Sequence, residues 1–186
     1  MPTFPMDYFL AFLDVRKGWL EGVCITGGEP LLHDDLDVLL TIIKERNLLV
    51  KIDTNGAYPG RLDSLIKNGL LDHVAMDVKT SFEKYPEAAG GPVDITNINQ
   101  SIAIITESNL DYAFRTTAVP GLVDREDIEK ISLVLQGSKV LRIQQYVPHK
   151  TLRSDYENIK PYSADELKHW AKVAAPYFTE VQLEGV

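Results

Sequence analysis

The sequence predicts an α/β fold built on a parallel sheet. Short apolar runs of strand length alternate along the chain with segments in which apolar residues recur every three or four positions. The strand-length runs recur roughly every 25 to 40 residues, a spacing that leaves room for one helix between successive strands. Strands joined in this way are parallel, and their crossovers are right-handed.

The predicted elements share one domain, because no low-complexity linker interrupts the alternation and we therefore expect residues 1–186 to fold as a single unit. Asp63, Asp124 and Ser163 are expected as N-terminal caps or first-turn acids of helices. The expected strands cover residues 22–26, 49–53, 73–78, 112–118, 140–147 and 180–183. The expected helices cover residues 7–17, 36–46, 61–67, 95–107, 124–135 and 164–175, and residues 85–94 are expected to form the longest loop.

The charge, the lack of long apolar runs and the single cysteine limit the kinds of partner and site that the chain can have. The formal charge of -8 and the pI near 5.0 argue against binding to nucleic-acid phosphates or anionic lipid, since both need a basic surface. No apolar run approaches the ~20 residues that span a bilayer, and the first residues do not read as a secretion signal, so we expect a cytoplasmic location. The single cysteine, Cys24, excludes an intramolecular disulfide and cannot supply a three-cysteine metal site. We expect Cys24 to be a small buried apolar residue.

Polar residues recur on one face of the predicted strands. Buried parallel strands normally read as continuous apolar runs, but here polar residues lie two apart and therefore on the same side. If these faces converge, they form a polar cavity at the carboxyl ends of the strands, as in (β/α) barrels. The alternative is that they reach solvent or form internal salt bridges. The pairs are Lys51 with Asp53, Asp77 with Lys79, Arg115 with Thr117, and Arg142 with Gln144.

The first predicted strand runs directly into a glycine-rich turn, Gly27-Gly28-Glu29-Pro30. Two glycines permit backbone torsions closed to other residues and allow a ligand to approach the main chain. Glu29 offers a carboxylate that suits an ammonium group. The alternative is a tight turn whose acid stabilises the start of the following helix.

This turn and three later segments resemble motifs of the radical S-adenosylmethionine (SAM) superfamily. ITGGEPLL at 25–32 resembles the motif that contacts the SAM amino group, and KIDTNG at 51–56 resembles the family's DTNG turn. AMDVK at 75–79 and FRTTAVPG at 114–121 resemble strand ends of glycyl-radical-enzyme activases, the group that acts on anaerobic ribonucleotide reductase or pyruvate formate-lyase. LRIQQY at 141–146 and EVQLEG at 180–185 resemble the closing strands, so the likeness extends over the whole chain.

The resemblance implies an incomplete (β/α)6 partial barrel of the TIM type with SAM as cofactor. Asp53 and Asp77 would alternatively suit a shared monovalent cation, since converging carboxylates repel one another. No role is predicted for His149, which we expect to be an ordinary surface residue like His33, His73 and His169. The implied SAM-binding residues are Gly27, Gly28, Glu29, Pro30, Asp53, Asn55, Asp77, Lys79 and Arg115, with a SAM carboxylate on Lys79 or Arg115.

The resemblance also implies a feature that this sequence lacks. Relatives hold a [4Fe–4S] cluster with a CxxxCxxC loop between the first barrel strand and the helix that corresponds to residues 7–17. Cys24 lies in the strand before the glycine-rich turn and does not replace that loop. We therefore expect the first strand and cluster loop to be missing, the chain alone to be inactive, and residues 22–26 to form an open sheet edge that favours self-association.

Three functions remain open on these observations. The first is the SAM-binding portion of an activase that generates a 5′-deoxyadenosyl radical and, with it, a glycyl radical on a partner enzyme. The second is a non-catalytic module that binds SAM or the partner. The third is a radical SAM enzyme acting on a small molecule, such as one of deazapurine synthesis.

Overall fold

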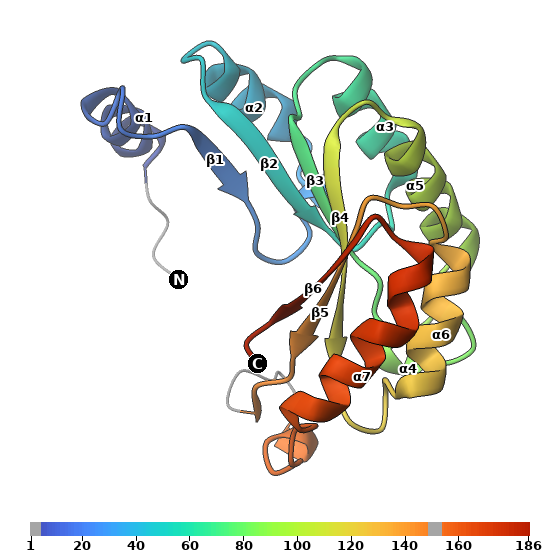
Figure 1. The fold of residues 1–186 in the computed structure, drawn as a ribbon. Coiled ribbons are helices and arrows are strands. Elements are labelled where there is room, and N and C mark those ends of the chain that lie inside the picture. The colour runs from blue at the N-terminus through green and yellow to red at the C-terminus, as the bar shows by residue number, and fades with distance from the viewer. Residues whose placement is uncertain (1–4, 149–153) are drawn as a thin grey trace.

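A computed structural model describes residues 5–148 and 154–186, and it contains six parallel strands in one open sheet (Figure 1). The strands follow one another across the sheet in chain order, and each pairs with the next in parallel register. The predicted α/β class and parallel sheet are confirmed. The strands are β1 (Gly22–Ile25), β2 (Leu49–Thr54), β3 (His73–Asp77), β4 (Asp111–Ala118), β5 (Val140–Gln145) and β6 (Glu180–Glu184).

Helices cover the outer side of this sheet, where α3, α5, α6 and α7 lie in a continuous row (Figure 1). The helices are α1 (Met6–Val15), α2 (Leu36–Lys44), α3 (Pro59–Lys67), α4 (Tyr85–Ala89), α5 (Ile95–Glu107), α6 (Arg125–Val134) and α7 (Ala164–Ala174). Short 3-10 turns η1 (Pro30–Leu32), η3 (Ser154–Tyr156) and η4 (Ala175–Tyr177) complete the described elements. None of the helices in the described ranges is long and apolar enough to cross a membrane.

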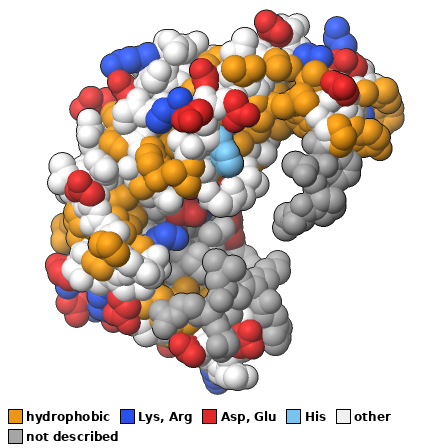
Figure 2. All heavy atoms as spheres, turned by 180° about the vertical axis from the view of Figure 1, so that it is seen from behind, with side chains coloured by type: hydrophobic (Ala, Val, Ile, Leu, Met, Phe, Trp, Pro, Cys, Tyr) orange, Lys and Arg blue, Asp and Glu red, His pale blue; other side chains and the backbone are white. Residues whose placement is uncertain are grey.

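The alternation of side chains along β2 explains how the sheet presents two different faces. Val50 and Ile52 are fully buried in the main core, whereas Lys51 and Asp53, which point to the opposite side, remain partly exposed. The strands are apolar where the helices pack on them and polar on the other face. Figure 2 shows the molecule from behind as a curved body hollowed on one side.

Local sequence signals account for most helix ends. Asp124 and Ser163 each form a capping box, so both predicted caps are confirmed. The prediction for Asp63 is wrong, because α3 begins earlier at Pro59, whose fixed φ suits a first helical turn. Asp63 instead forms an ion pair with Lys67 one turn later, at 2.7 Å.

The segment predicted as the longest loop contains a short helix, α4. Its first residue, Tyr85, is almost completely buried, and Gly90 ends it with a φ of 75°. A left-handed residue after the last turn is a common helix ending, and glycine adopts it without strain. The loop prediction missed α4 because five residues are too few to establish a helical period.

The two edges of the described sheet are β1 and β6. Helix α1 precedes β1. Its Leu13 is buried in the main core, and its Asp14 forms an ion pair at 2.8 Å with Arg46, which follows α2. The edge position of β1 agrees with the expected open edge. Self-association through that edge stays a prediction.

Candidate functional site

The central feature of the polar face is Arg115, which lies between two carboxylates from neighbouring strands. Its Nε donates to Asp77 Oδ1 at 2.7 Å, and its Nη1 donates to Asp53 Oδ2 at 2.9 Å. Lys51 pairs with the other oxygen of Asp53 at 2.9 Å. The sheet register sets Asp77 directly beside Arg115. One guanidinium therefore links β2, β3 and β4.

Burial and ion pairing shift the pKa values of Asp53 and Arg115 in opposite directions. Burial alone raises the pKa of Asp53, but hydrogen bonds from Lys51 and Arg115 outweigh it and hold that pKa below its usual value. Burial alone lowers the pKa of Arg115, and the carboxylates of Asp77 and Asp53 raise it instead. Asp53 and Arg115 therefore form an ion pair at neutral pH. Arg115 supplies the charge between Asp53 and Asp77 that sequence reasoning had alternatively assigned to a monovalent cation.

A cavity of about 500 Å³ opens beside these three side chains at the carboxyl ends of β3 to β6. Asp77, Lys79 and Arg115 line it on one side, while Val119 and Leu122 contribute apolar surface. This placement agrees with the predicted polar cavity at the strand ends. Among the residues that the structure describes, the ammonium of Lys79 forms no ion pair, so it is an unmatched positive charge at the cavity.

Glu29 is not in this cavity, and its carboxylate is taken up by protein groups. It is buried and accepts from the Leu31 amide at 3.2 Å, the Thr54 hydroxyl at 2.8 Å and the Asn55 amide at 2.7 Å. Glu29 thus caps η1, in line with the alternative reading of the turn. Its carboxylate joins the turn after β1 to the turn after β2, and three of its roughly four acceptor positions are used within the protein. A SAM-binding role for Glu29 stays a prediction.

The two turns that Glu29 joins present main chain to the open side. Gly27 and Gly28 have φ angles of 94° and 57°, and no atom lies within 4 Å of a Cβ built at either position. Pro30 is buried behind them. Asn55 accepts from the Ala57 amide at 2.9 Å, which closes a local turn after β2.

The predicted site residues therefore fall into two groups. Asp77, Lys79 and Arg115 line the cavity, and Asp53 joins them through Arg115. The second group, Gly27, Gly28, Glu29, Pro30 and Asn55, lies on the turns after β1 and β2, outside the lining of that cavity. The predicted SAM-binding residues are thus divided between the cavity and the turns after β1 and β2.

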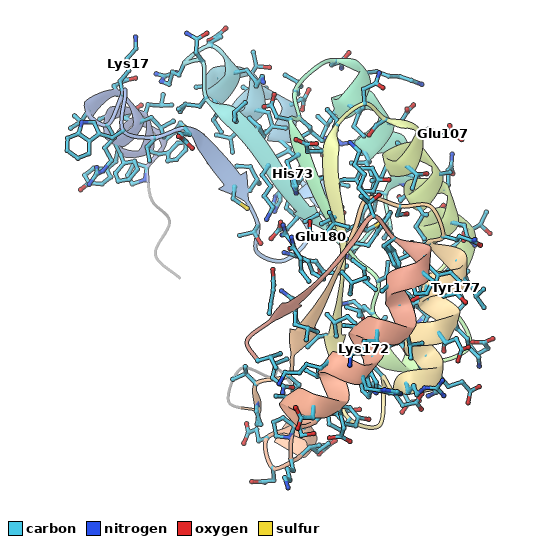
Figure 3. All side chains as sticks on the ribbon, viewed as in Figure 1. Lys17, His73, Glu107, Lys172, Tyr177 and Glu180 are labelled. Carbon is cyan, nitrogen blue, oxygen red and sulfur yellow. The ribbon has the colours of Figure 1, made fainter. Side chains whose placement is uncertain are left out.

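Two further expectations are corrected. Cys24 is exposed, with its Sγ 3.9 Å from Asp53 Oδ1, because it lies on the polar side of an edge strand; it is not a buried apolar residue. His73 is half-buried among the strands (Figure 3), so it is not a surface histidine. Burial, with Lys51 and Arg142 nearby, lowers the His73 pKa. His149 lies outside the described residues.

Sequence reasoning included Arg142 and Gln144 of β5 in the predicted polar cavity, but it gave them no SAM-binding role and left out β6. Gln144 donates to Glu184 at 2.7 Å, Arg142 donates to Gln182 at 2.8 Å, and Gln144 and Glu184 both line the cavity. The signal was present, because Gln182 and Glu184 alternate with apolar residues along β6 just as Arg142 and Gln144 do along β5.

Comparison with known families identifies the fold. The model of the radical SAM superfamily matches residues 5–134. The chain belongs to the radical SAM superfamily. A protein of Methanocaldococcus jannaschii named as a glycyl-radical enzyme activating enzyme is 33% identical over 180 residues, which cover 94% of this chain and 75% of that protein. A second such protein of the same organism is 25% identical, covering 91% of this chain and 66% of its own length.

Solved structures share the architecture of this chain. A domain of the pyruvate-formate lyase-activating enzyme of Bacteroides vulgatus superposes with a TM-score of 0.71 at 18% identity, covering 88% of this chain and 99% of that domain. SuiB of Streptococcus suis, in a structure bound to SAM, superposes with a TM-score of 0.74 at 17% identity, covering all of this chain and 44% of SuiB. The 7-carboxy-7-deazaguanine synthase of Geobacter sulfurreducens is 28% identical over 172 residues, covering 90% of this chain and 63% of that protein.

The superfamily implies SAM and a [4Fe–4S] cluster, and the two groups fit this chain differently. The cavity offers opposite charges and apolar walls, which suit a zwitterionic nucleoside. Cluster ligation needs several thiolates, whereas the sequence contains one cysteine. In the described ranges, no three His, Cys, Asp or Glu side chains are grouped to hold a metal ion.

The three hydrogen bonds that the buried Glu29 carboxylate accepts predict an effect on stability. In Glu29→Gln an amide NH2 replaces one acceptor oxygen and faces N–H donors, so a buried hydrogen bond is lost. We expect the free energy of unfolding to fall by about 1–3 kcal/mol, measured by urea denaturation. The control is Glu21→Gln, an equal change at an exposed position, which should leave stability within about 0.5 kcal/mol. Equal stability of the two variants would contradict a stabilising role for the Glu29 hydrogen bonds.

The ion pair between Asp53 and Arg115 predicts a pH dependence of stability. Because the folded-state pKa of Asp53 lies below its usual 3.8, its contribution is complete above that value and is lost as the pH falls through the folded-state pKa. Asp53→Asn should therefore be less stable than the unaltered protein at pH 7, and this gap should narrow at pH 3. Urea unfolding at both pH values measures it. Asp34→Asn, at an exposed position, should show no such gap; a gap for Asp53→Asn that is constant with pH would refute the assignment.

Proposed function

We propose that this chain is the SAM-binding portion of a radical SAM activating enzyme that forms a glycyl radical on a partner enzyme. The observation that carries the proposal is the cavity beside the Asp53–Arg115–Asp77 triad, with the unpaired ammonium of Lys79 at its lining. Membership of the superfamily and the names of the M. jannaschii relatives support it.

In this proposal the two ends of the SAM methionine meet different groups. Lys79 binds the carboxylate, because Arg115 already holds two carboxylates and Lys79 holds none within residues 5–148 and 154–186. The ammonium meets the open main chain at Gly27 and Gly28 and the remaining acceptor position of the Glu29 carboxylate. Asp53 and Asp77 hold Arg115 at the same cavity, and Asn55 and Pro30 lie on the turns after β2 and β1.

This chain does not supply the cysteine ligands of the [4Fe–4S] cluster. In the superfamily the cluster delivers the electron that cleaves SAM, and three cysteines hold it. The single cysteine of this chain cannot provide that ligand set, so we assign the chain alone no radical chemistry. The full activity requires cysteines from another segment or another chain.

The activase assignment competes with a small-molecule function. The 28% identity to a 7-carboxy-7-deazaguanine synthase favours that alternative. The 33% identity to the first M. jannaschii relative favours the activase. A glycyl radical on a partner protein, seen by electron paramagnetic resonance when a cysteine-bearing segment is supplied, would decide for the activase.

SAM binding tests the pocket directly. Lys79→Ala removes the charge assigned to the carboxylate, and we expect SAM affinity, measured by isothermal titration calorimetry, to fall roughly ten- to hundredfold. The control is Lys172→Ala, which removes an exposed lysine of α7 far from the cavity (Figure 3) and should not change affinity. Equal affinities for both variants would exclude Lys79, and no binding by the unaltered chain would refute the SAM-binding proposal.

Iron reconstitution tests the missing ligand set. After anaerobic incubation with iron and sulfide followed by desalting, we expect the chain to retain no stable four-iron cluster, because one thiolate cannot hold it. Iron and acid-labile sulfide are measured together with the visible absorption. A stoichiometric four-iron species would overturn the statement that this chain lacks the cluster ligands.

A further inference from the structure

We infer that the hydroxyl of Tyr85 is a positioning residue for Lys79 and thereby sets the affinity of this site for the carboxylate of its ligand. The inference rests on the proposed SAM site and adds a residue that makes no contact with the cavity itself. Tyr85 begins α4, the helix that sequence patterns did not predict.

The Tyr85 hydroxyl contacts the main chain on both sides of the exit from β3. It donates to the carbonyl of Asp77 at 3.3 Å and accepts from the amide of Lys79 at 3.4 Å. The amide of Val78, between them, pairs with the carbonyl of Arg115 at 2.8 Å, continuing the sheet. Sheet pairing is thus replaced at Lys79 by a side-chain oxygen.

Tyr85 is itself held in place. Its side chain is 1% exposed, and its ring packs against Phe82 with centroids 6.1 Å apart. Burial raises the pKa of Tyr85 to about 12, so the hydroxyl keeps its proton at neutral pH and can donate and accept at once.

The segment between Lys79 and Tyr85 is anchored to the start of α6. The Thr80 hydroxyl donates to the Leu122 carbonyl at 2.6 Å, and the Ser81 hydroxyl donates to Asp127 at 2.6 Å. Lys84 reaches the other oxygen of Asp127, also at 2.6 Å. Asp127 is almost fully buried. Lys79 therefore extends from a segment fixed at both ends, and the Tyr85 hydroxyl is the contact nearest to it.

The chain offers a matched control in Tyr112. Its ring is also buried, and its hydroxyl also accepts from a lysine amide, that of Lys139, at 3.3 Å. It lies at the start of β4, at the opposite end of the strands from the cavity. Tyr85→Phe and Tyr112→Phe therefore remove equivalent groups, and only the first is next to the site.

The test compares SAM with its decarboxylated analogue, S-adenosylmethioninamine, by calorimetry on the full chain. We expect Tyr85→Phe to weaken SAM binding roughly three- to tenfold and to leave the analogue unchanged, while Tyr112→Phe changes neither. Loss of affinity for both ligands in Tyr85→Phe, or for neither, would overturn the inference while the proposed site stands.

Amide hydrogen exchange, followed by NMR without ligand, tests whether Tyr85 holds the Lys79 amide independently of whether the chain binds SAM. In Tyr85→Phe the Lys79 amide should exchange at least about tenfold faster, and the Val78 amide should not change. An unchanged Lys79 rate refutes the positioning role whatever SAM does. If the unaltered chain binds no SAM, the proposed function fails and the carboxylate role fails with it, while the exchange rates still decide whether Tyr85 holds the Lys79 amide.

Discussion

The interaction on which the polar face depends is the bridge from Arg115 to Asp53 and Asp77. Ionised groups on a half-buried sheet need partners, because removing one partner leaves an uncompensated charge. Here each charge lies within 3 Å of an opposite one. The bridge joins three adjacent strands at their carboxyl ends and thereby fixes the wall of the cavity. It also leaves Lys79 as the charge that can serve a ligand.

Two other contacts hold the turns beyond the strand ends. Glu29 joins the turns that follow β1 and β2 with three hydrogen bonds, and Tyr85 spans the exit from β3. In both cases a buried side chain satisfies main-chain amides that the sheet no longer pairs. Main-chain positions near the cavity are thus set by residues that do not line it.

Structural relatives with 17–18% identity retain this fold. Such divergence is compatible with a common sheet because a core needs apolar residues of suitable size at the right period, and many sequences meet that requirement. Function depends instead on a few polar groups at strand ends. The family model that matches residues 5–134 places this chain in the superfamily. The shared fold alone does not determine the reaction, which depends on the groups at the site.

The sequence by itself determined the order and type of the main elements, the parallel sheet and the motifs at the strand ends. These follow from periods of two and 3.6 residues and from short segments, which are local properties. It also placed Asp77, Lys79 and Arg115 at the ends of neighbouring strands, because parallel strands end at one edge of the sheet.

Only the tertiary structure decided how those residues are partnered. Arg115 reaches Asp53 across 62 positions of sequence, and Glu29 reaches Thr54 across 25, so no local pattern reveals either contact. Exposure of Cys24 and half-burial of His73 depend on whether another layer covers the polar face. Tyr85 could not be assigned from sequence because its contacts depend on how α4 folds back against β3. The segment before α4 is held to α6 by hydrogen bonds from Ser81 and Lys84 to Asp127.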